Sequence, residues 1–303
     1  MNKKIALVGC GIWGQNILKE LIILNSEVHV FETNPALRDT AIKLGAVQFS
    51  DGLPSVNDNF DGLIVATPST THRPVLEKLA GLDIPVFLEK PLTTNLEDAL
   101  ALRELSHDDI YLMHIWLYHP GILMLKDIAQ SKELGNVLGV RSTRANWTSP
   151  RTDTDSVWNL SPHDITIAKA VLGYIPDPKS AIAECHHGII RGLVALLGDD
   201  PYCIFEVSNR YERKVREVRI HCEKGVAILE DEKVDAIKIV RGDAASDPKK
   251  MEIEFRKFDK TPPLRFEIRE FLDFLNGGAT PRSSFEDGLE VIKTIHDIVE
   301  LAK

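Results

Sequence analysis

The chain has 303 residues, of which 44% are hydrophobic and 27% charged, a composition typical of globular proteins that bury a core without disulfides or structural metal. Its formal net charge of −9 argues against binding nucleic acid or an anionic membrane through bulk charge. No apolar run approaches the ~18 residues of a membrane span, and the length is typical of two domains.

Cysteine usage indicates the redox compartment. The four cysteines show no Cys-x-x-Cys spacing, which favours reduced thiols in a cytoplasmic protein. The lysines before the apolar stretch 5–10 resemble a short lipoprotein export signal, but this stretch is shorter than the ~7–15 residues that such a signal needs. We therefore expect a cytoplasmic protein.

Apolar runs alternate with amphipathic segments over residues 1–120. The runs at 5–8, 28–31, 63–66, 86–88 and 110–113 predict buried strands. Helical patterns lie between them, at 73–81, at 95–106, after the first strand and after Pro35. This alternation predicts an α/β domain with a doubly wound parallel sheet, the Rossmann type.

The pattern changes over residues 121–303. Strand-like segments at 137–144, 181–186, 203–207, 215–220 and 251–256 include several that alternate apolar with polar residues, which is typical of an antiparallel sheet with one wet face. Helices are expected at 162–172, 264–276 and 284–302. We therefore predict a second, α+β domain on an open antiparallel sheet, with the final helix packing back on the first domain.

A glycine-rich turn follows the first predicted strand, with the sequence Gly9-Cys10-Gly11-Ile12-Trp13-Gly14. In a dinucleotide-binding turn the first glycine allows a tight turn, the second lets the backbone approach a pyrophosphate, and the third lets helix and strand pack closely. The alternative is a glycine turn without a ligand. The strand before it and the helix after it favour the dinucleotide site.

Glu32 ends the second strand 32 − 14 = 18 residues after the motif, close to the ~20 expected of the acidic residue that binds the adenosine ribose. A carboxylate there repels a 2′-phosphate, and the next residues, Thr33, Asn34 and Pro35, supply no arginine to neutralise one. The sequence therefore favours NAD over NADP. A solvated acidic strand end is the alternative.

Three further motifs carry a family resemblance. The segment 66–72 reads Ala-Thr-Pro-Ser-Thr-Thr-His, the segment 89–91 reads Glu-Lys-Pro, and the segment 158–165 reads Trp-Asn-Leu-Ser-Pro-His-Asp-Ile. Together with the glycine turn, and in this order, they resemble the glucose–fructose oxidoreductase / inositol dehydrogenase (Gfo/Idh/MocA) family. The resemblance extends over the whole chain. The segment 158–165 is similar to that of a family branch associated with bacterial sugar and nucleotide-sugar metabolism.

This resemblance implies site residues. The cofactor would contact residues of the loops after four strands, namely Gly9, Gly11, Ile12, Trp13, Gly14, Glu32, Thr33, Ala66, Thr67, Pro68, His72, Glu89 and Lys90. Lys90 would stand near the nicotinamide, and a desolvated lysine can take the proton of a substrate hydroxyl. His163, expected at the start of helix 162–172, would assist as a general acid or base. A surface ion pair with Glu89 is the alternative for the lysine, and a helix cap or core group for the histidine.

Substrate contacts are expected from Lys90, His114, Tyr118, Arg151, Asn159 and His163. Asn159 departs from the family pattern, which carries aspartate there; asparagine can bind a sugar hydroxyl but cannot act as a base. Arg151 has a guanidinium suited to a phosphate or carboxylate, although a solvated loop is equally consistent with it. Tyr118 fits the core as well as the site.

Two classes of function remain open. The first is an NAD-dependent enzyme acting on a hydroxyl or ketone of a sugar, cyclic polyol or nucleotide sugar, and the second is a non-catalytic sugar- or NAD-sensing protein on the same scaffold. The histidines and cysteines show no metal-ligand spacing, so we expect no metal. The family resemblance implies a homodimer or homotetramer.

Overall fold

The computed structural model describes residues 2–104, 109–147, 154–243, 245–247, 249 and 251–303. Its contacts divide the chain into two units. The first contains residues 1–115 and 262–292, and the second contains residues 116–261 and 293–303. The sequence interpretation placed one boundary at 120 and expected only the final helix to return to the first domain, whereas the first unit also takes in a helix at 263–274.

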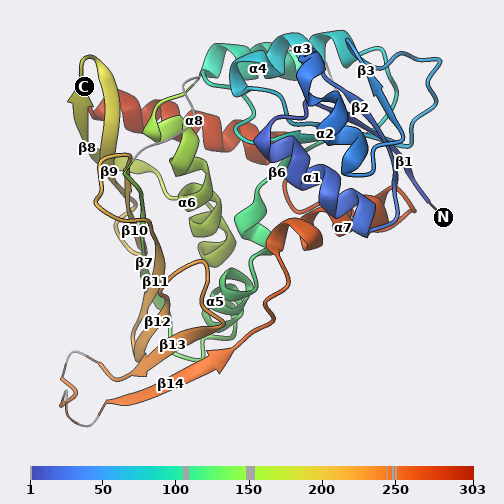
Figure 1. Ribbon diagram of the computed structural model, residues 1–303. Coiled ribbons are helices and arrows are strands. Elements are labelled where there is room, and N and C mark those ends of the chain that lie inside the picture. The colour runs from blue at the N-terminus through green and yellow to red at the C-terminus, as the bar shows by residue number, and fades with distance from the viewer. Residues whose placement is uncertain (1, 105–108, 148–153, 244, 248, 250) are drawn as a thin grey trace. The chain divides into compact units, whose positions relative to one another are not determined.

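The first unit is built on a six-stranded parallel sheet of order β3-β2-β1-β4-β5-β6 (Figure 1). All of its strand pairs are parallel, which confirms the predicted doubly wound sheet. Its elements before the second unit are β1 (Lys4–Val8), α1 (Ile12–Ile23), β2 (Glu27–Phe31), α2 (Arg38–Lys43), β3 (Gln48–Ser50), β4 (Gly62–Val65), α3 (His72–Leu79), β5 (Val86–Glu89), α4 (Leu96–Glu104) and β6 (Ile110–Met113). The short edge strand β3 was not predicted.

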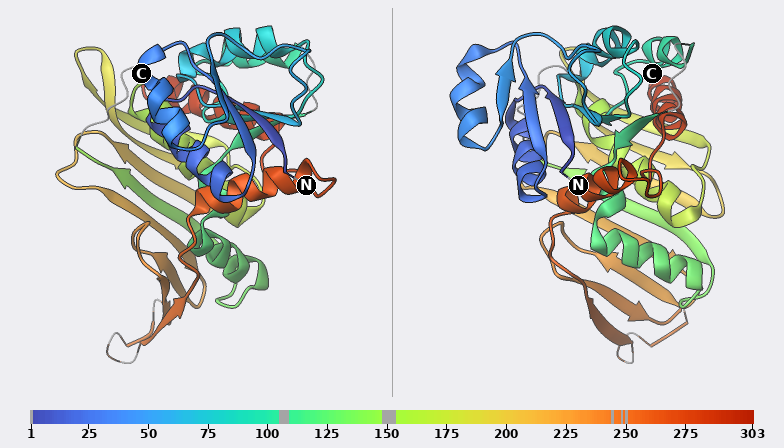
Figure 2. Two further views of the ribbon diagram at one scale, coloured as in Figure 1. Left: turned by 45° about the vertical axis from the view of Figure 1, so that its right-hand side comes forward. Right: turned by 90° about the vertical axis from the view of Figure 1, so that its right-hand side faces the viewer.

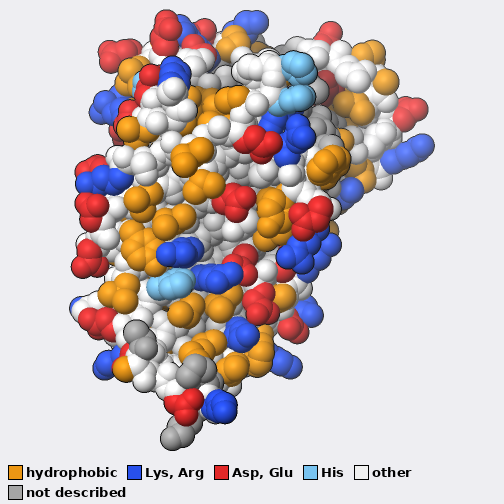
Figure 3. Space-filling view, turned by 90° about the vertical axis from the view of Figure 1, so that its left-hand side faces the viewer, with side chains coloured by type: hydrophobic (Ala, Val, Ile, Leu, Met, Phe, Trp, Pro, Cys, Tyr) orange, Lys and Arg blue, Asp and Glu red, His pale blue; other side chains and the backbone are white. Residues whose placement is uncertain are grey.

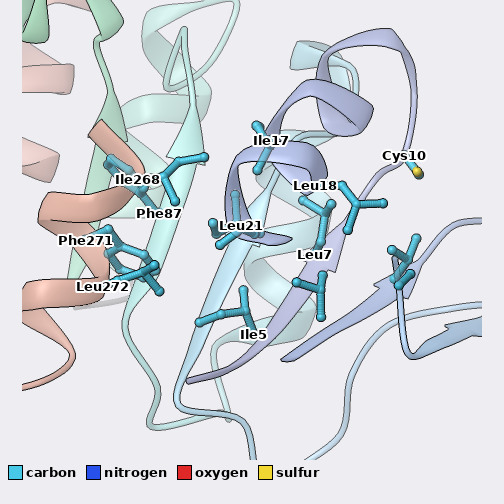
Figure 4. Close-up of a cluster of buried hydrophobic side chains, with 14 of the residues drawn as sticks. Ile5, Leu7, Cys10, Ile17, Leu18, Leu21, Phe87, Ile268, Phe271 and Leu272 are labelled. Carbon is cyan, nitrogen blue, oxygen red and sulfur yellow. The ribbon is translucent and has the colours of Figure 1, made fainter. Parts of the chain in front are cut away.

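Two segments from the end of the chain complete this unit, α7 (Pro263–Phe274) and the first part of α8 (Phe285–Leu301). Helix α7 packs on the sheet where Gly62 leaves room, because a Cβ there would lie 2.7 Å from Leu275 and 3.1 Å from Phe271. Phe271 stacks on Phe87 of β5, with ring centroids 4.8 Å apart. Figure 4 shows α1 and α7 contributing to one hydrophobic cluster with β1 and β5.

The second unit is built on an eight-stranded sheet of order β14-β13-β12-β11-β7-β10-β9-β8. Its pairs are antiparallel except β7–β10, which is parallel. Helices α5 and α6 cover one face (Figure 2). The elements are α5 (Pro120–Ser131), β7 (Val137–Ala145), α6 (Ser156–Leu172), β8 (Pro178–His186), β9 (Ile189–Leu197), β10 (Tyr202–Ser208), β11 (Val215–Cys222), β12 (Gly225–Leu229), β13 (Ala236–Arg241) and β14 (Glu252–Lys257).

One predicted boundary in this unit is wrong. Helix α6 begins at Ser156, not at residue 162, so His163 lies inside the helix rather than at its start. The Asp155 carboxylate caps the helix by accepting hydrogen bonds from the backbone N–H groups of Val157 and Trp158. Pro162 therefore sits in the helix interior, where it removes one backbone hydrogen bond without ending the helix.

The aromatic stack between sheet and α7 supplies a stability prediction. Replacing Phe271, which is 0% exposed, by alanine should lower the free energy of unfolding of the first unit by about 3–5 kcal/mol, because it removes buried ring contacts and leaves a cavity. Urea unfolding followed by tryptophan fluorescence measures this. The control Phe255→Ala, at a side chain 64% exposed on β14, should change the value by less than about 0.5 kcal/mol; equal effects would contradict the proposed packing role.

Candidate cofactor and substrate sites

The glycine turn after β1 has the backbone that the motif predicts. Gly9 adopts φ +95°, and a Cβ on it would lie 2.7 Å from the carbonyl oxygen of Ala66, while a Cβ on Gly14 would overlap the carbonyl oxygen of Gly9. Around Gly11, in contrast, nothing lies within 4 Å of the Cβ position. The first and third glycines are thus required by packing, whereas the second leaves the backbone open to a phosphate at the N-terminus of α1.

The Glu32 carboxylate is tied to this turn. Its Oε2 accepts a hydrogen bond of 2.8 Å from the backbone N–H of Cys10, and its Oε1 accepts one of 2.9 Å from the N–H of Asn34. A carboxylate has about four acceptor positions, so sites remain for ribose hydroxyls. Burial, followed by the charge of Glu32, raises the pKa of the Cys10 thiol to about 11; the thiol therefore stays neutral at physiological pH.

His72 joins the loops that follow β4 and β5. The ring is 0% exposed; its Nδ1 lies 2.8 Å from the carbonyl oxygen of Pro91, and its Nε2 lies 3.2 Å from that of Thr67. The peptide bond between Lys90 and Pro91 is cis. His72 therefore holds the Thr67 loop and the Lys90 loop at a fixed spacing.

An unpartnered hydroxyl lies in the same region. The Thr67 Oγ1 is buried, and it has no hydrogen-bond partner among the described residues. A buried polar atom of this kind ordinarily has a partner, which can be a ligand or water. The hydroxyl lies in the loop against which Gly9 packs, so the residues present fit a dinucleotide whose phosphates face the glycine turn.

The sheet order brings these loops to one edge. Parallel strands β2, β1, β4, β5 and β6 are neighbours, and their carboxyl ends carry Glu32, the glycine turn, the Ala66–Thr67–Pro68 segment, Glu89 with Lys90, and His114. Ligands bind at this edge in open α/β sheets. His114 is 1% exposed, and its Nδ1 lies 2.7 Å from the hydroxyl oxygen of Ser283.

The sequence did not predict the surroundings of two buried acidic side chains, Glu89 and Glu267. Trp13 donates a hydrogen bond from its indole Nε1 to the carboxylate of Glu89, which is only 8% exposed. Glu267 on α7 is 0% exposed, and neither of its carboxylate oxygens has a hydrogen-bond partner within the described part of the chain. Burial, then the charges of Glu89 and Glu270, raises the pKa of Glu267 well above its usual range. Only its spacing of four from Phe271 signalled that Glu267 faces the sheet.

The second unit holds the other predicted residues. Asn159 and His163 lie four residues apart on α6, so they share one face of the helix, and both are partly buried. The next residue, Asp164, is instead structural, because its carboxylate receives 2.8 and 3.3 Å hydrogen bonds from the guanidinium of Arg144. The Arg144 guanidinium carbon lies 4.2 Å from the ring centroid of Trp116, whose ring lies 6.5 Å from that of His163.

Two predicted substrate residues, Tyr118 and Arg151, are not placed at a site by the structure. Tyr118 is 1% exposed, which favours its core alternative, and Arg151 lies outside the described residues. Groups of three or more side chains able to hold a metal ion do not occur within the described ranges. Among the helices that the structure describes, none has the length and apolar character to cross a membrane.

The N-terminal third of the chain matches a known protein family. Residues 3–109 match the Gfo/Idh/MocA model, described as "Oxidoreductase family, NAD-binding Rossmann fold". An inositol 2-dehydrogenase of Pseudarthrobacter chlorophenolicus is 25% identical over 62% of this chain and 65% of its own length. A D-xylose 1-dehydrogenase (NADP(+)) of Haloferax volcanii is 25% identical over 88% of each chain. The chain matches 55–65% of the length of the first three inositol dehydrogenases found.

Solved structures show the same fold over the whole chain. UDP-N-acetylglucosamine 3-dehydrogenase from Acidithiobacillus ferrooxidans superposes with a TM-score of 0.84 at 20% identity, over 99% of this chain and 97% of that one. Levoglucosan dehydrogenase in complex with NADH gives 0.86 at 15% identity, over 100% and 97%. These likenesses confirm the predicted fold class. The resemblance to the Gfo/Idh/MocA family is confirmed over residues 3–109, which match its NAD-binding Rossmann-fold model.

Proposed function

We propose that this protein is an NAD-dependent dehydrogenase or reductase that acts on a secondary hydroxyl, or the corresponding ketone, of a sugar, cyclic polyol or nucleotide sugar. The observation that carries the proposal is the edge of the parallel sheet where Glu32, the glycine turn, Thr67 and Lys90 follow neighbouring strands. The substrate class is supported by the relatives, which are named as inositol and xylose dehydrogenases, and by the fold of the levoglucosan and UDP-N-acetylglucosamine enzymes.

Cofactor binding follows from the first unit. The N-terminus of α1 and the open backbone at Gly11 would hold the pyrophosphate, and Ile12, Trp13 and Thr33 are further residues proposed to contact the cofactor. The Glu32 carboxylate, which also holds the N–H of Cys10, would accept hydrogen bonds from the ribose hydroxyls. Its negative charge disfavours a 2′-phosphate, so NAD is the proposed cofactor, although two relatives are named as NADP enzymes.

Proton transfer is assigned to this chain's own side chains. When bound, the nicotinamide accepts the hydride in oxidation and donates it in reduction. Lys90 takes the hydroxyl proton during oxidation and, in its protonated form, gives a proton to the ketone oxygen during reduction as hydride adds to the carbon. His163 assists this transfer, and Asn159 and Arg151 bind substrate hydroxyl or acidic groups, whereas the buried His114 is held by Ser283. Asn159 bears no charge, so it orients substrate and takes no proton.

The Lys90 role predicts a selective loss of turnover. Lys90→Met should lower kcat by about 10²–10⁴-fold, the usual contribution of a proton-transfer group, while the NAD Kd stays within a few-fold. The measurement is NADH absorbance with a panel of myo-inositol, D-xylose, levoglucosan and UDP-N-acetylglucosamine. Lys78→Met, at an exposed position on α3, is the control. Binding of NAD and sugar without turnover in either direction would support the sensing protein instead.

The Glu32 role predicts a change of cofactor. Glu32→Ala combined with Thr33→Arg removes the charge that repels a 2′-phosphate and adds a cation, so the affinity for NADP relative to NAD should rise at least about tenfold, or about 1.4 kcal/mol. The single variant Thr33→Arg controls for the added charge. Because Glu32 also holds the N–H of Cys10, the double variant should lose part of its absolute affinity for both nucleotides. An unchanged preference would refute the selective role of Glu32.

Self-association is proposed for the sheet face of the second unit opposite α5 and α6, giving a homodimer or homotetramer. Ile182 and Val194 are cross-strand neighbours on β8 and β9 and are 77% and 44% exposed. Figure 3 shows hydrophobic side chains spread among charged ones on this side of the molecule. Burying such a surface in a second copy would remove it from water.

If the protein self-associates through Ile182 and Val194, introducing a negative charge at each of these positions should disrupt the oligomer. The unmodified protein should sediment as a dimer or tetramer, and the double variant Ile182→Asp, Val194→Asp should shift toward the monomer mass in analytical ultracentrifugation, because unpaired carboxylates would be buried at the interface. Leu100→Asp, at an exposed position on α4, should leave the mass unchanged. A monomeric unmodified protein would disprove the association.

A further inference from the structure

A carboxyl group on α7, that of Glu267, is buried without a hydrogen-bond partner among the described residues. Figure 4 shows α7 running opposite to β1, because Ile268 lies nearer to the Cys10 edge of the sheet than Phe271 and Leu272 do. Phe271 stacks on Phe87. Glu267 lies one helical turn before Phe271 on α7. Glu89 lies two residues after Phe87, on the same side of β5. This register sets the two carboxyl groups opposite each other, one step beyond the aromatic pair.

The charged groups that flank Glu267 on α7 are engaged in ion pairs. On α7, Glu270 pairs with Arg282, and Arg265 pairs with Glu20 of α1. Helix α1 presents Trp13, which does not titrate and which donates to Glu89. Lys90 follows Glu89 in the chain, and His114 follows β6 with Ser283 as its partner. No cation contacts the Glu267 oxygens among the residues that the structure describes.

We propose that Glu89 and Glu267, as a charge-coupled pair, retain one proton on one of the two carboxyl groups, and that release of this proton is coupled to the charge of the nicotinamide, so that the preference for NAD⁺ over NADH rises with pH. This inference rests on the proposed function, since it needs a nicotinamide at the loop after β5. It makes Glu267 a positioning residue that acts through Glu89 and does not itself touch substrate.

The sign follows from electrostatics. Two neighbouring carboxyl groups in a poorly solvated site do not both ionise easily, so one of them keeps a proton. The ring of NAD⁺ carries a positive charge and that of NADH does not, so NAD⁺ favours the doubly ionised pair more than NADH does. By reciprocity, ionising the pair at higher pH strengthens NAD⁺ binding relative to NADH. A buried orphan carboxyl among Ile268, Phe271 and Phe87 thereby acquires a role that an apolar residue could not supply.

The test measures Kd for NAD⁺ and for NADH by isothermal calorimetry at pH 6, 7, 8 and 9. In the unmodified protein the ratio Kd(NADH)/Kd(NAD⁺) should rise about 3–10-fold over this range, as expected for a unit charge acting across a partly screened distance. Glu267→Gln should remove most of this rise, and the control Asp273→Asn, at an exposed position on the same helix, should retain it. An identical pH dependence in Glu267→Gln and in the unmodified protein would overturn the inference, as would a flat ratio in the unmodified protein.

A second measurement needs no variant. Titrations in two buffers of different ionisation enthalpy count the protons released on binding, and NAD⁺ should release more than NADH. Equal proton counts for the two nucleotides also overturn the inference. Failure to bind either nucleotide refutes the proposed function itself, whereas tight binding of both with equal proton counts refutes only the shared proton.

Protein stability gives an independent readout of the protonated state. The folded protein raises the pKa of Glu267, so between the unfolded and the folded pKa the native state binds more protons and unmodified protein loses stability as pH rises. Glu267→Gln lacks this loss. Its unfolding free energy relative to the unmodified protein should therefore increase from pH 5 to pH 8, and a constant or decreasing difference would contradict a protonated Glu267.

Discussion

The arrangement of loops at the carboxyl edge of the parallel sheet depends on one contact, in which three backbone segments meet at the end of β1. The Gly9 turn packs against the carbonyl of Ala66, and the first turn of α1 packs against Gly9 so closely that Gly14 has no room for a side chain. These contacts set the N-terminus of α1 over the ends of β1 and β4. They also leave Gly11 as the open position, so one packing solution both builds the turn and exposes the backbone that a phosphate would approach.

Side-chain hydrogen bonds then fix the neighbouring loops to this turn. Glu32 holds the N–H of Cys10 from the side of β2, and His72 bridges the loops after β4 and β5. Trp13 reaches from α1 to Glu89. Each of these polar groups thus joins two strand ends, and the edge is held in place before any ligand arrives, which lowers the entropic cost of binding.

In the second unit, a buried ion pair supports the helix that carries the proposed substrate residues. A buried ion pair between Arg144 and Asp164, 2% and 0% exposed, ties β7 to the helix that carries Asn159 and His163. The indole of Trp116 covers the guanidinium. Because removing one member of such a pair leaves an uncompensated buried charge, this connection fixes the orientation of α6. Asp164, although adjacent to His163 in the sequence motif, is thereby committed to structure.

Local patterns in the sequence determined the strand–helix alternation, the glycine turn and its acidic partner, and the loops of Thr67 and Lys90. They did so because hydrophobic period and glycine conformation are short-range properties. The start of α6 was misplaced, since Pro162 suggested an N-terminus while the cap at Asp155 permitted an earlier one. Only the tertiary structure decided that α7 covers β4 and β5, that Asp164 pairs with Arg144, and that Glu267 is buried. These contacts join residues far apart in the chain, and their burial depends on packing that no local pattern encodes.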